Sequence, residues 1–169
     1  MDTLLEGVLA RMVTLHPGME FSMQKPANDS LKVDADVSLL EQALTNILAN
    51  AVEACHGKGT VTIFVGTTRH FKEAVLFNRQ IETLLPGQSG IEEDFIRIPI
   101  RVNGPGIPPE IQDRIFVPFF TTKKTGSGIG LPLAQKIVHA HGGVLDMKSV
   151  VGKGTEFIIK IPMRESGGR

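Results

Sequence analysis

The strongest constraint on the fold is a run of apolar residues at helical spacing between residues 38 and 55. The apolar side chains recur at intervals of three or four, which places them on one face of a helix. Ser38 and Glu41 form a capping-box pattern at the start of the run, and Gly57 follows it as a helix-ending residue. The pattern predicts an amphipathic helix that buries one face against a second layer.

The other segments indicate strands and helices in mixed order. The alternation of three isoleucines and Val102 predicts a strand at 95–102 with one buried face. Residues 69–94 are expected to form a long, mobile excursion, in which residues 74–77 are a candidate extension of a hairpin. The order of elements predicts a two-layer α/β sandwich, a mixed sheet with about three helices packed on one face. The other predicted strands are 19–24, 31–34, 60–65, 144–149 and 155–161, and the other predicted helices are 4–15, 110–115 and 131–140.

Composition disfavours several classes of function. The chain has 18 Lys+Arg and 18 Asp+Glu residues, so it has no global field to attract nucleic acid or an anionic membrane. It has neither Trp nor Tyr, which disfavours proteins that stack single-stranded bases on aromatic rings. The longest apolar runs are shorter than a membrane span, and Met1-Asp2 does not begin a signal peptide. Cys55 is the one cysteine, so no internal disulfide can form and a reducing, cytoplasmic location is expected.

A glycine run, Gly126-x-Gly-x-Gly130, comes directly before the predicted helix at 131–140. Several backbone N–H groups at the positive end of a helix dipole can bind a phosphate. A flexible turn explains the same residues, so the run alone leaves both interpretations open.

Three polar residues lie beside the apolar face of the helix at 38–55. At 100° per residue, Asn46, Asn50 and Glu53 fall within about 60° of arc. An amide left unpaired at the edge of a core costs about 1–3 kcal/mol, so these side chains need partners. They either cap neighbouring loops or offer a side-chain carbonyl to Mg²⁺, which prefers oxygen ligands and bridges nucleotide phosphates.

Two lysines, Lys123 and Lys124, stand just ahead of the glycine run. A charge pair in a loop is often only a solvated tip. Two ammonium groups beside a glycine-rich phosphate site are also well placed to bind a triphosphate. In that case Phe119 and Phe120 are expected to pack down and anchor the loop.

Together these signals resemble the catalytic domain of the sensor histidine kinases. Residues 40–54 look like the N box of that family and residues 103–110 like its G1 box. Residues 115–120 are similar to the F box and residues 126–131 to the G2 box. The resemblance spans about residues 31–162 and is greatest to the nitrogen-regulation type of sensor kinase. It continues through His141-Gly-Gly, Ser149 and Gly154-Thr155.

This resemblance implies a GHKL ATPase with a Bergerat-type fold, formed as one domain over residues 1–169. It implies ATP and Mg²⁺ as cofactors, a histidine on a separate dimerisation domain as phosphate acceptor, and a response regulator as partner. Asn50 would bind Mg²⁺, while Asn46 and Lys123 would act on the phosphates as the candidate catalytic residues. Thr155 is similar to a threonine that holds the adenine edge through water. The implied nucleotide-binding residues are Asn46, Asn50, Glu53, Val102, Gly104, Gly106, Ile107, Phe116, Thr122, Lys123, Gly126, Gly128, Gly130, Leu131 and Thr155.

Asn46 distinguishes the chain from other branches of the superfamily. Gyrase-type, mismatch-repair and heat-shock chaperone ATPases place a glutamate four residues before the metal-binding asparagine, where it serves as general base. An amide cannot accept a proton at neutral pH, so we expect slow hydrolysis of ATP by water.

Val102 departs from the pattern of the family. The G1 box normally begins with an aspartate that accepts a hydrogen bond from the adenine amino group, and Val102 stands at that position. A hydrogen bond to a charged group contributes about 1.5–3 kcal/mol, so its loss predicts roughly 10- to 150-fold weaker ATP binding and poorer base selectivity.

A phosphoacceptor is not recognisable in the sequence. The target histidine of the family is normally followed by an acidic residue, and we expect the chain to be a catalytic fragment without the dimerisation hairpin. Such a fragment would not autophosphorylate alone. The five histidines, none followed by Asp or Glu, are His16, His56, His70, His139 and His141.

Two alternatives stay open. An anti-sigma-factor serine kinase is similar in size and fold and needs no dimerising hairpin. A pseudokinase that has lost ATP binding at Val102 would instead act as an interaction module. DNA binding is disfavoured because the net charge is +0.

Overall fold

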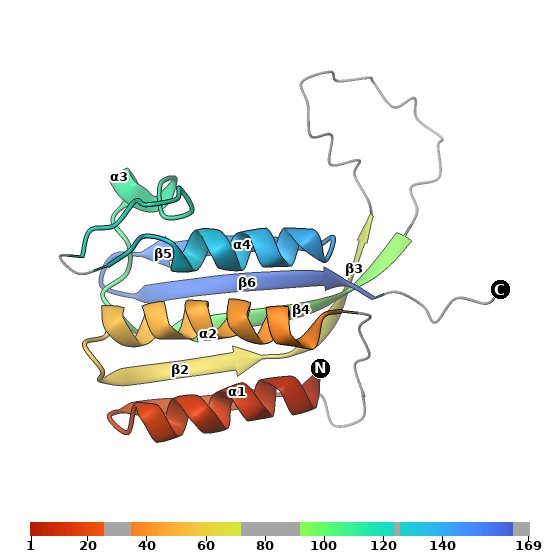
Figure 1. Cartoon of the computed structure of the whole chain (residues 1–169), viewed down its shortest axis with the longest axis horizontal. Helices are drawn as coiled ribbons and strands as arrows, with labels where there is room; N and C mark the ends of the chain where they lie inside the picture. The colour runs from red at the N-terminus through yellow and green to blue at the C-terminus, as the bar shows by residue number, and fades with distance from the viewer. Residues whose placement is uncertain (26–34, 72–91, 124–125, 164–169) are drawn as a thin grey trace, which may run out of the picture.

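The computed structural model describes residues 1–25, 35–71, 92–123 and 126–163. It confirms the predicted helices at 4–15, 38–55 and 131–140 and five of the predicted strands, each within a few residues. The predicted strand at 31–34 and the hairpin extension at 74–77 lie outside the described residues. The elements are α1 (Asp2–Leu15), β1 (Met19–Gln24), α2 (Val37–Ala54), β2 (Gly59–Phe64), β3 (Gly66–Phe71), β4 (Glu92–Val102), α3 (Pro109–Gln112), α4 (Gly130–Ala140), β5 (Val144–Val150) and β6 (Gly154–Pro162) (Figure 1).

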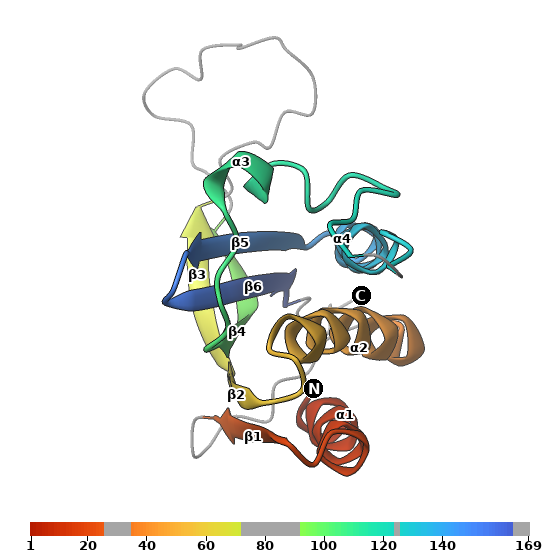
Figure 2. The ribbon, with the colours of Figure 1, turned by 90° about the vertical axis from the view of Figure 1, so that its left-hand side faces the viewer.

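The strands of the described residues form one mixed sheet in the order β1-β2-β4-β6-β5, with β3 paired to the first half of β4. β1 runs parallel to β2, and every other pairing is antiparallel. Helices α1, α2 and α4 lie on one face, and α2 packs against both of the others (Figure 2). The predicted two-layer α/β sandwich is therefore confirmed.

Two elements differ from the expectation. β3 overlaps the start of the excursion expected at residues 69–94, because it pairs with β4 from Gly66 opposite Arg97 to Phe71 opposite Glu92. Its polar residues show no apolar alternation, so a partner strand rather than a local pattern specifies it. α3 is shorter than the predicted helix at 110–115, since the chain continues beyond it in turns, with the Arg114 N–H donating to the Ile111 carbonyl at 2.9 Å.

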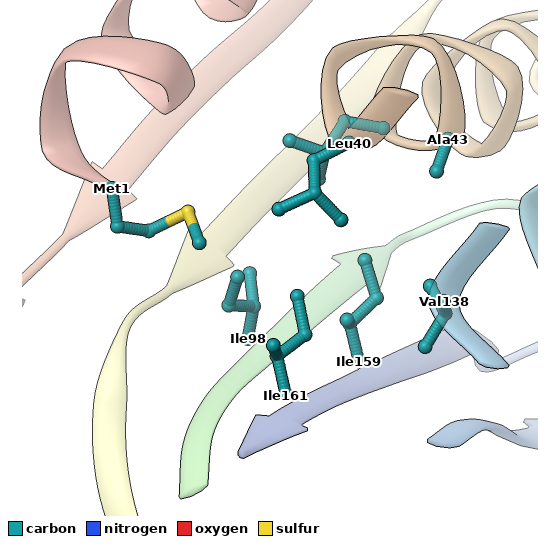
Figure 3. A pocket seen from close by; sticks show the side chains of 8 residues that line it. Met1, Leu40, Ala43, Ile98, Val138, Ile159 and Ile161 are labelled. Carbon is teal, nitrogen blue, oxygen red and sulfur yellow. The ribbon is translucent and has the colours of Figure 1, made fainter. Parts of the chain in front are cut away.

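The core lies between α2 and the sheet. The predicted phase of β4 is confirmed, because its three isoleucines and Val102 are all buried and Ile98 lies beside Leu40 and Ala43 of α2. A cavity of about 10 Å³ lies within this core (Figure 3). Its volume is close to that of one water molecule and its walls are apolar, so it is a packing defect rather than a ligand site. The residues around it are Met1, Leu40, Ala43, Leu44, Ile98, Val138, Ile159 and Ile161.

The start of α2 differs from the predicted capping box. The N-cap is Asp36, whose carboxylate accepts a hydrogen bond from the Leu39 N–H at 3.1 Å, while Ser38 is exposed within the first turn. The carboxylate lies nearer the uncapped N–H groups and interacts favourably with the helix dipole, so it displaces the hydroxyl from this role. Glu41 pairs instead with Arg11 of α1.

The end of α2 agrees with the prediction that the helix stops before Gly57. Both His56 and Gly57 have positive φ angles, of 52° and 71°. The Gly57 N–H donates to the Val52 carbonyl at 2.9 Å and the His56 N–H to the Glu53 carbonyl at 3.0 Å. This Schellman closure satisfies the last carbonyl groups of the helix and turns the chain into β2.

The two candidate N-caps can be separated by mutation. Asp36→Ala should lower the free energy of unfolding by about 1 kcal/mol, because it leaves the Leu39 N–H without its acceptor. The matched variant Ser38→Ala should change it by less than about 0.5 kcal/mol, since this side chain is exposed and caps nothing. Urea unfolding followed by circular dichroism measures both free energies. A larger loss of stability in Ser38→Ala than in Asp36→Ala would show that Ser38 caps the helix.

Candidate functional site

Polar residues gather where the second half of α2 faces α4 and the loop before it. The Asn50 side-chain nitrogen donates to the Asn46 backbone carbonyl at 2.9 Å, which leaves the Asn50 Oδ1 oxygen to face outward. The Lys123 ammonium donates to this oxygen at 3.1 Å and also pairs with the Glu53 carboxylate. The Lys123 ammonium therefore contacts Asn50 Oδ1, the oxygen that the sequence predicts to be a metal ligand.

Asn46 has an unsatisfied donor. Its Nδ2 atom is buried and has no hydrogen-bond partner among the described residues. A buried donor without an acceptor costs about 1–3 kcal/mol, so a native structure rarely keeps one without reason. An oxygen-rich group bound beside α2 would satisfy it, and the oxygens of a phosphate fit this requirement.

The start of α4 lies directly against the two asparagines. A Cβ atom at Gly130 would lie 3.1 Å from Asn50 Nδ2 and 3.9 Å from Asn46 Cβ, so a side chain at this position would crowd the Asn50 amide. No side chain caps the first N–H groups of this 11-residue helix. Unpaired N–H groups at a helix start favour an anion, so the asparagines and this helix end form one site suited to phosphate.

The loop that leads into α4 carries the other glycines of the run. Gly128 lies against the backbone of Phe119, whose N–H donates to the Gly128 carbonyl at 2.9 Å. Gly126 lies against Thr121 and Lys123, so the loop folds back on itself around these contacts. Thr122 is exposed on it, and Lys124 lies outside the described residues.

The two phenylalanines of this loop do not both anchor it. Phe119 is 76% exposed and has a φ of 64°, so the expectation that it packs down is wrong. Phe120 is half-buried, and the Arg114 guanidinium lies 4.2 Å from the centre of its ring. The tight turn formed with Gly128 directs Phe119 outward, whereas a cation–π contact holds Phe120.

A second group of predicted residues lies where β4 ends. Gly106 has a φ of 77° and its Cα faces the Val150 backbone so closely that a side chain would not fit. The Gly152 N–H donates to the Pro105 carbonyl at 2.8 Å, which ties this loop to the turn between β5 and β6. The loop is thus held close to the turn between β5 and β6.

Hydrogen bonds to Ser149 of β5 and from Gln112 of α3 hold the same loop, and the sequence assigned no role to these two residues. The Ile107 N–H donates to the Ser149 hydroxyl at 2.8 Å, and the Gln112 amide donates to the Ile107 carbonyl at 2.7 Å. Ser149 also lies 2.8 Å from the Thr155 hydroxyl. Ser149 belongs to the tail motif, so the sequence carried a signal for it, whereas nothing in the sequence marked Gln112.

Val102 lies opposite Thr155 in the register of β4 and β6 and is 6% exposed. Its alternation with the buried isoleucines directs its side chain toward the helices. Phe116 and Leu131 are half-buried and pack against the same core, so they support the site from its apolar side. The predicted residues therefore form two groups, one between α2 and α4 and one at the end of β4.

Cys55, the C-cap of α2, lies beside the loop that follows β4. A Cβ atom at Gly104 would lie 3.0 Å from the Cys55 sulfur. Burial raises the pKa of this thiol, so it stays protonated and unreactive at neutral pH. It acts as a small apolar support beneath the loop at Gly104.

The described residues contain no cluster of three His, Cys, Asp or Glu side chains that could hold a metal ion. An Asn oxygen together with phosphate and water oxygens remains a suitable set for Mg²⁺, which commonly takes few ligands from the protein. Within the same residues, no helix has the length and apolarity needed to cross a membrane.

Residues 35–165 match the family model described as histidine kinase-, DNA gyrase B-, and HSP90-like ATPase. The chain is 35% identical to sensor histidine kinase ZraS of Salmonella typhi over 145 residues, 85% of this chain and 26% of that protein. It is 32% identical to the sensory histidine kinase/phosphatase NtrB of Escherichia coli O157:H7 over 167 residues, 94% of this chain and 42% of that protein. The chain thus spans about a quarter to two fifths of these relatives.

Solved structures agree with these matches. The catalytic domain of histidine kinase ThkA superposes with a TM-score of 0.73 at 27% identity, covering 96% of this chain and 91% of that chain. ThkA in complex with the response regulator protein TrrA superposes with a TM-score of 0.67 at 26% identity, covering 97% of this chain and 40% of that chain.

Proposed function

Because this chain belongs to the family of histidine kinase-, DNA gyrase B- and HSP90-like ATPases, we propose that it transfers the γ-phosphate of ATP to a histidine on a separate dimerisation domain. The observation that carries the proposal is the junction of α2 and α4. There the unsatisfied Asn46 nitrogen, the outward Asn50 oxygen and the uncapped start of α4 meet beside the Lys123 ammonium. These groups offer donors and a cation to phosphate and an oxygen to a metal ion.

Each of these residues has a distinct part in the proposed site. Asn50 would hold Mg²⁺ through Oδ1, and the metal supplies charge neutralisation between phosphate oxygens. The amide is already oriented for this, because its nitrogen is committed to the Asn46 carbonyl. Asn46 would donate Nδ2 to a phosphate oxygen, which removes the cost of its buried, unpaired state.

The Lys123 ammonium is proposed to change its partner when nucleotide binds. Its ammonium is bonded to the Asn50 oxygen, and two cations on one oxygen repel each other. We propose that Lys123 leaves this oxygen and turns to the terminal phosphate when nucleotide binds. Its pairing with Glu53 is no obstacle, because both side chains are well exposed and such pairs contribute little to stability.

We also propose a partner and a cellular location for the full-length protein. A response regulator is the proposed partner of the full-length protein, since the related kinase ThkA forms a complex with the response regulator TrrA. A reducing, cytoplasmic location is proposed because the one cysteine is buried as a free thiol.

Val102 should make nucleotide binding weak. The side chain offers no acceptor to the adenine amino group, so ATP should bind roughly 10- to 150-fold less tightly than to the Val102→Asp variant. Isothermal titration calorimetry of the two proteins with Mg-ATP measures the difference. Val102→Thr serves as a control that keeps the volume and β-branch without a charged acceptor.

Micromolar affinity in the unchanged chain would contradict this interpretation of Val102. The apolar Val102 also favours a second candidate function, that of an interaction module that has lost the ability to bind ATP. Millimolar Mg-ATP should raise the melting temperature of a kinase that binds it. If the melting temperature stays unchanged in both the unmodified chain and Val102→Asp, the function as an interaction module is favoured over the kinase function.

Asn46 should make hydrolysis by water slow. A general base contributes about 10²- to 10⁴-fold to proton-transfer steps, and an amide cannot serve as one. Asn46→Glu should therefore raise the rate of ATP hydrolysis, whereas Asn46→Gln, of the same length, should not. A coupled phosphate-release assay measures all three proteins at saturating nucleotide, and a fast rate in the unchanged chain would exclude this role for Asn46.

Phosphoryl transfer tests the function directly. The chain is incubated with radiolabelled ATP and the phosphoacceptor hairpin of a related sensor kinase, and label is expected on the hairpin. The label should be lost in acid and kept in base, as for phosphohistidine. Acid-stable label would indicate the anti-sigma-factor type of serine kinase. Lys123→Met should reduce the transfer of label to the hairpin. The control variant Lys148→Met, at an exposed lysine, should leave this transfer unchanged.

A further inference from the structure

Two side-chain oxygens of α2 converge on one cation. The Lys123 ammonium donates to Asn50 Oδ1 at 3.1 Å and pairs with the Glu53 carboxylate. Residues three apart are neighbours on the surface of a helix, so one small group can contact both oxygens. The Lys123 nitrogen therefore marks a point at which α2 already holds a positive charge.

The chemistry of these two oxygens suits a divalent cation as well as an ammonium. Mg²⁺ prefers oxygen ligands, and it is commonly held by one or two carboxylates together with substrate phosphates. The Asn50 oxygen is fixed, because its amide nitrogen donates to the Asn46 carbonyl at 2.9 Å. The Glu53 side chain is 60% exposed, so its carboxylate is free to approach to the shorter distance of about 2.1 Å that Mg²⁺ requires.

The charge of Glu53 matters most when nucleotide binds. In the proposed function Lys123 turns to the terminal phosphate, and Glu53 then keeps a negative charge beside a triphosphate without its cation. Like charges repel, so an unneutralised carboxylate at this position would weaken the binding of nucleotide. A second cation at the point that the ammonium leaves removes this repulsion.

We propose that Glu53 is a second protein ligand of the divalent cation, so that Asn50 and Glu53 exchange the Lys123 ammonium for the metal ion. This inference rests on the proposed nucleotide-binding function and extends it. The carboxylate would repel nucleotide that arrives without metal and attract the metal that accompanies it. Glu53 therefore makes the binding of nucleotide depend more strongly on metal than Asn50 alone would.

Another role for Glu53 would be to tether Lys123 by an ion pair and nothing more. Such pairs contribute little between exposed side chains, and these two are 60% and 37% exposed. A tether would also compete with the phosphate for Lys123, so its loss would strengthen the binding of nucleotide with or without metal. Loss of a metal ligand weakens binding when metal is present, and experiment can therefore separate the two roles.

The test measures the affinity for the non-hydrolysable analogue AMP-PNP twice, in excess Mg²⁺ and in excess EDTA. NMR titration of the isotope-labelled protein is suitable because it also measures weak binding. Glu53→Gln keeps the length of the side chain and removes its charge. It should weaken binding in Mg²⁺ about threefold and strengthen binding in EDTA about threefold, so the ratio of the two affinities should fall about tenfold.

Two further variants serve as controls. Glu41 also lies on α2 and also pairs with a cationic side chain, that of Arg11, so Glu41→Gln should leave both affinities unchanged. Glu53→Asp keeps the charge on a shorter side chain. It should retain the weak binding in EDTA without the full affinity in Mg²⁺, because its carboxylate stops short of the point that the Lys123 nitrogen occupies.

An affinity in Mg²⁺ that is unchanged or higher in Glu53→Gln overturns the inference, as does full affinity in Glu53→Asp. Equal weakening in Mg²⁺ and in EDTA indicates a structural role and also overturns it. The proposed function stands in each of these cases, because the unchanged chain still binds the nucleotide. Failure of AMP-PNP to bind the unchanged chain and Val102→Asp in either condition overturns the proposed function and the inference together.

Discussion

The close approach of α4 to α2 is the constraint on which the rest of the site depends. Gly130 lies so near the Asn50 amide that a Cβ atom there would lie 3.1 Å from Asn50 Nδ2, and a side chain would displace this amide by a few tenths of an ångström. The packing of α4 on α2 brings the uncapped start of α4 beside the polar edge of α2, and the loop before α4 carries Lys123 to the Asn50 oxygen. Core packing thus gathers two amides, a helix start and a cation within one small region.

The end of β4 is organised by a different kind of interaction. Here hydrogen bonds hold the loop that follows β4. The Ile107 N–H donates to Ser149 and the Ile107 carbonyl accepts from Gln112. The β5–β6 turn donates to the Pro105 carbonyl. A loop anchored at several points loses little further entropy when it binds a ligand. The rigidity of this half of the site contrasts with the exposed lysine of the other half, which must move in the proposed reaction.

Much of this arrangement could be predicted from local patterns. Period and phase identified α2 and β4 correctly, because burial of one face imposes a regular spacing on apolar residues. The prediction of a capping box at Ser38 was wrong, and β3 was not predicted. Several polar residues near a helix start compete for the same N–H groups, and only the path of the chain decides in favour of Asp36. β3 has no apolar alternation, and the strand exists because β4 offers it an edge.

The sequence by itself determined the class of fold and the membership of the family, because both are written in residue type and spacing. Only the tertiary structure decided how these parts meet. Asn50 and Lys123 are far apart in sequence, and their contact follows from the packing of α4 on α2. The hydrogen bond between the Ser149 and Thr155 hydroxyls likewise depends on β5 and β6 lying side by side, and no pattern within one segment can encode a contact between two strands.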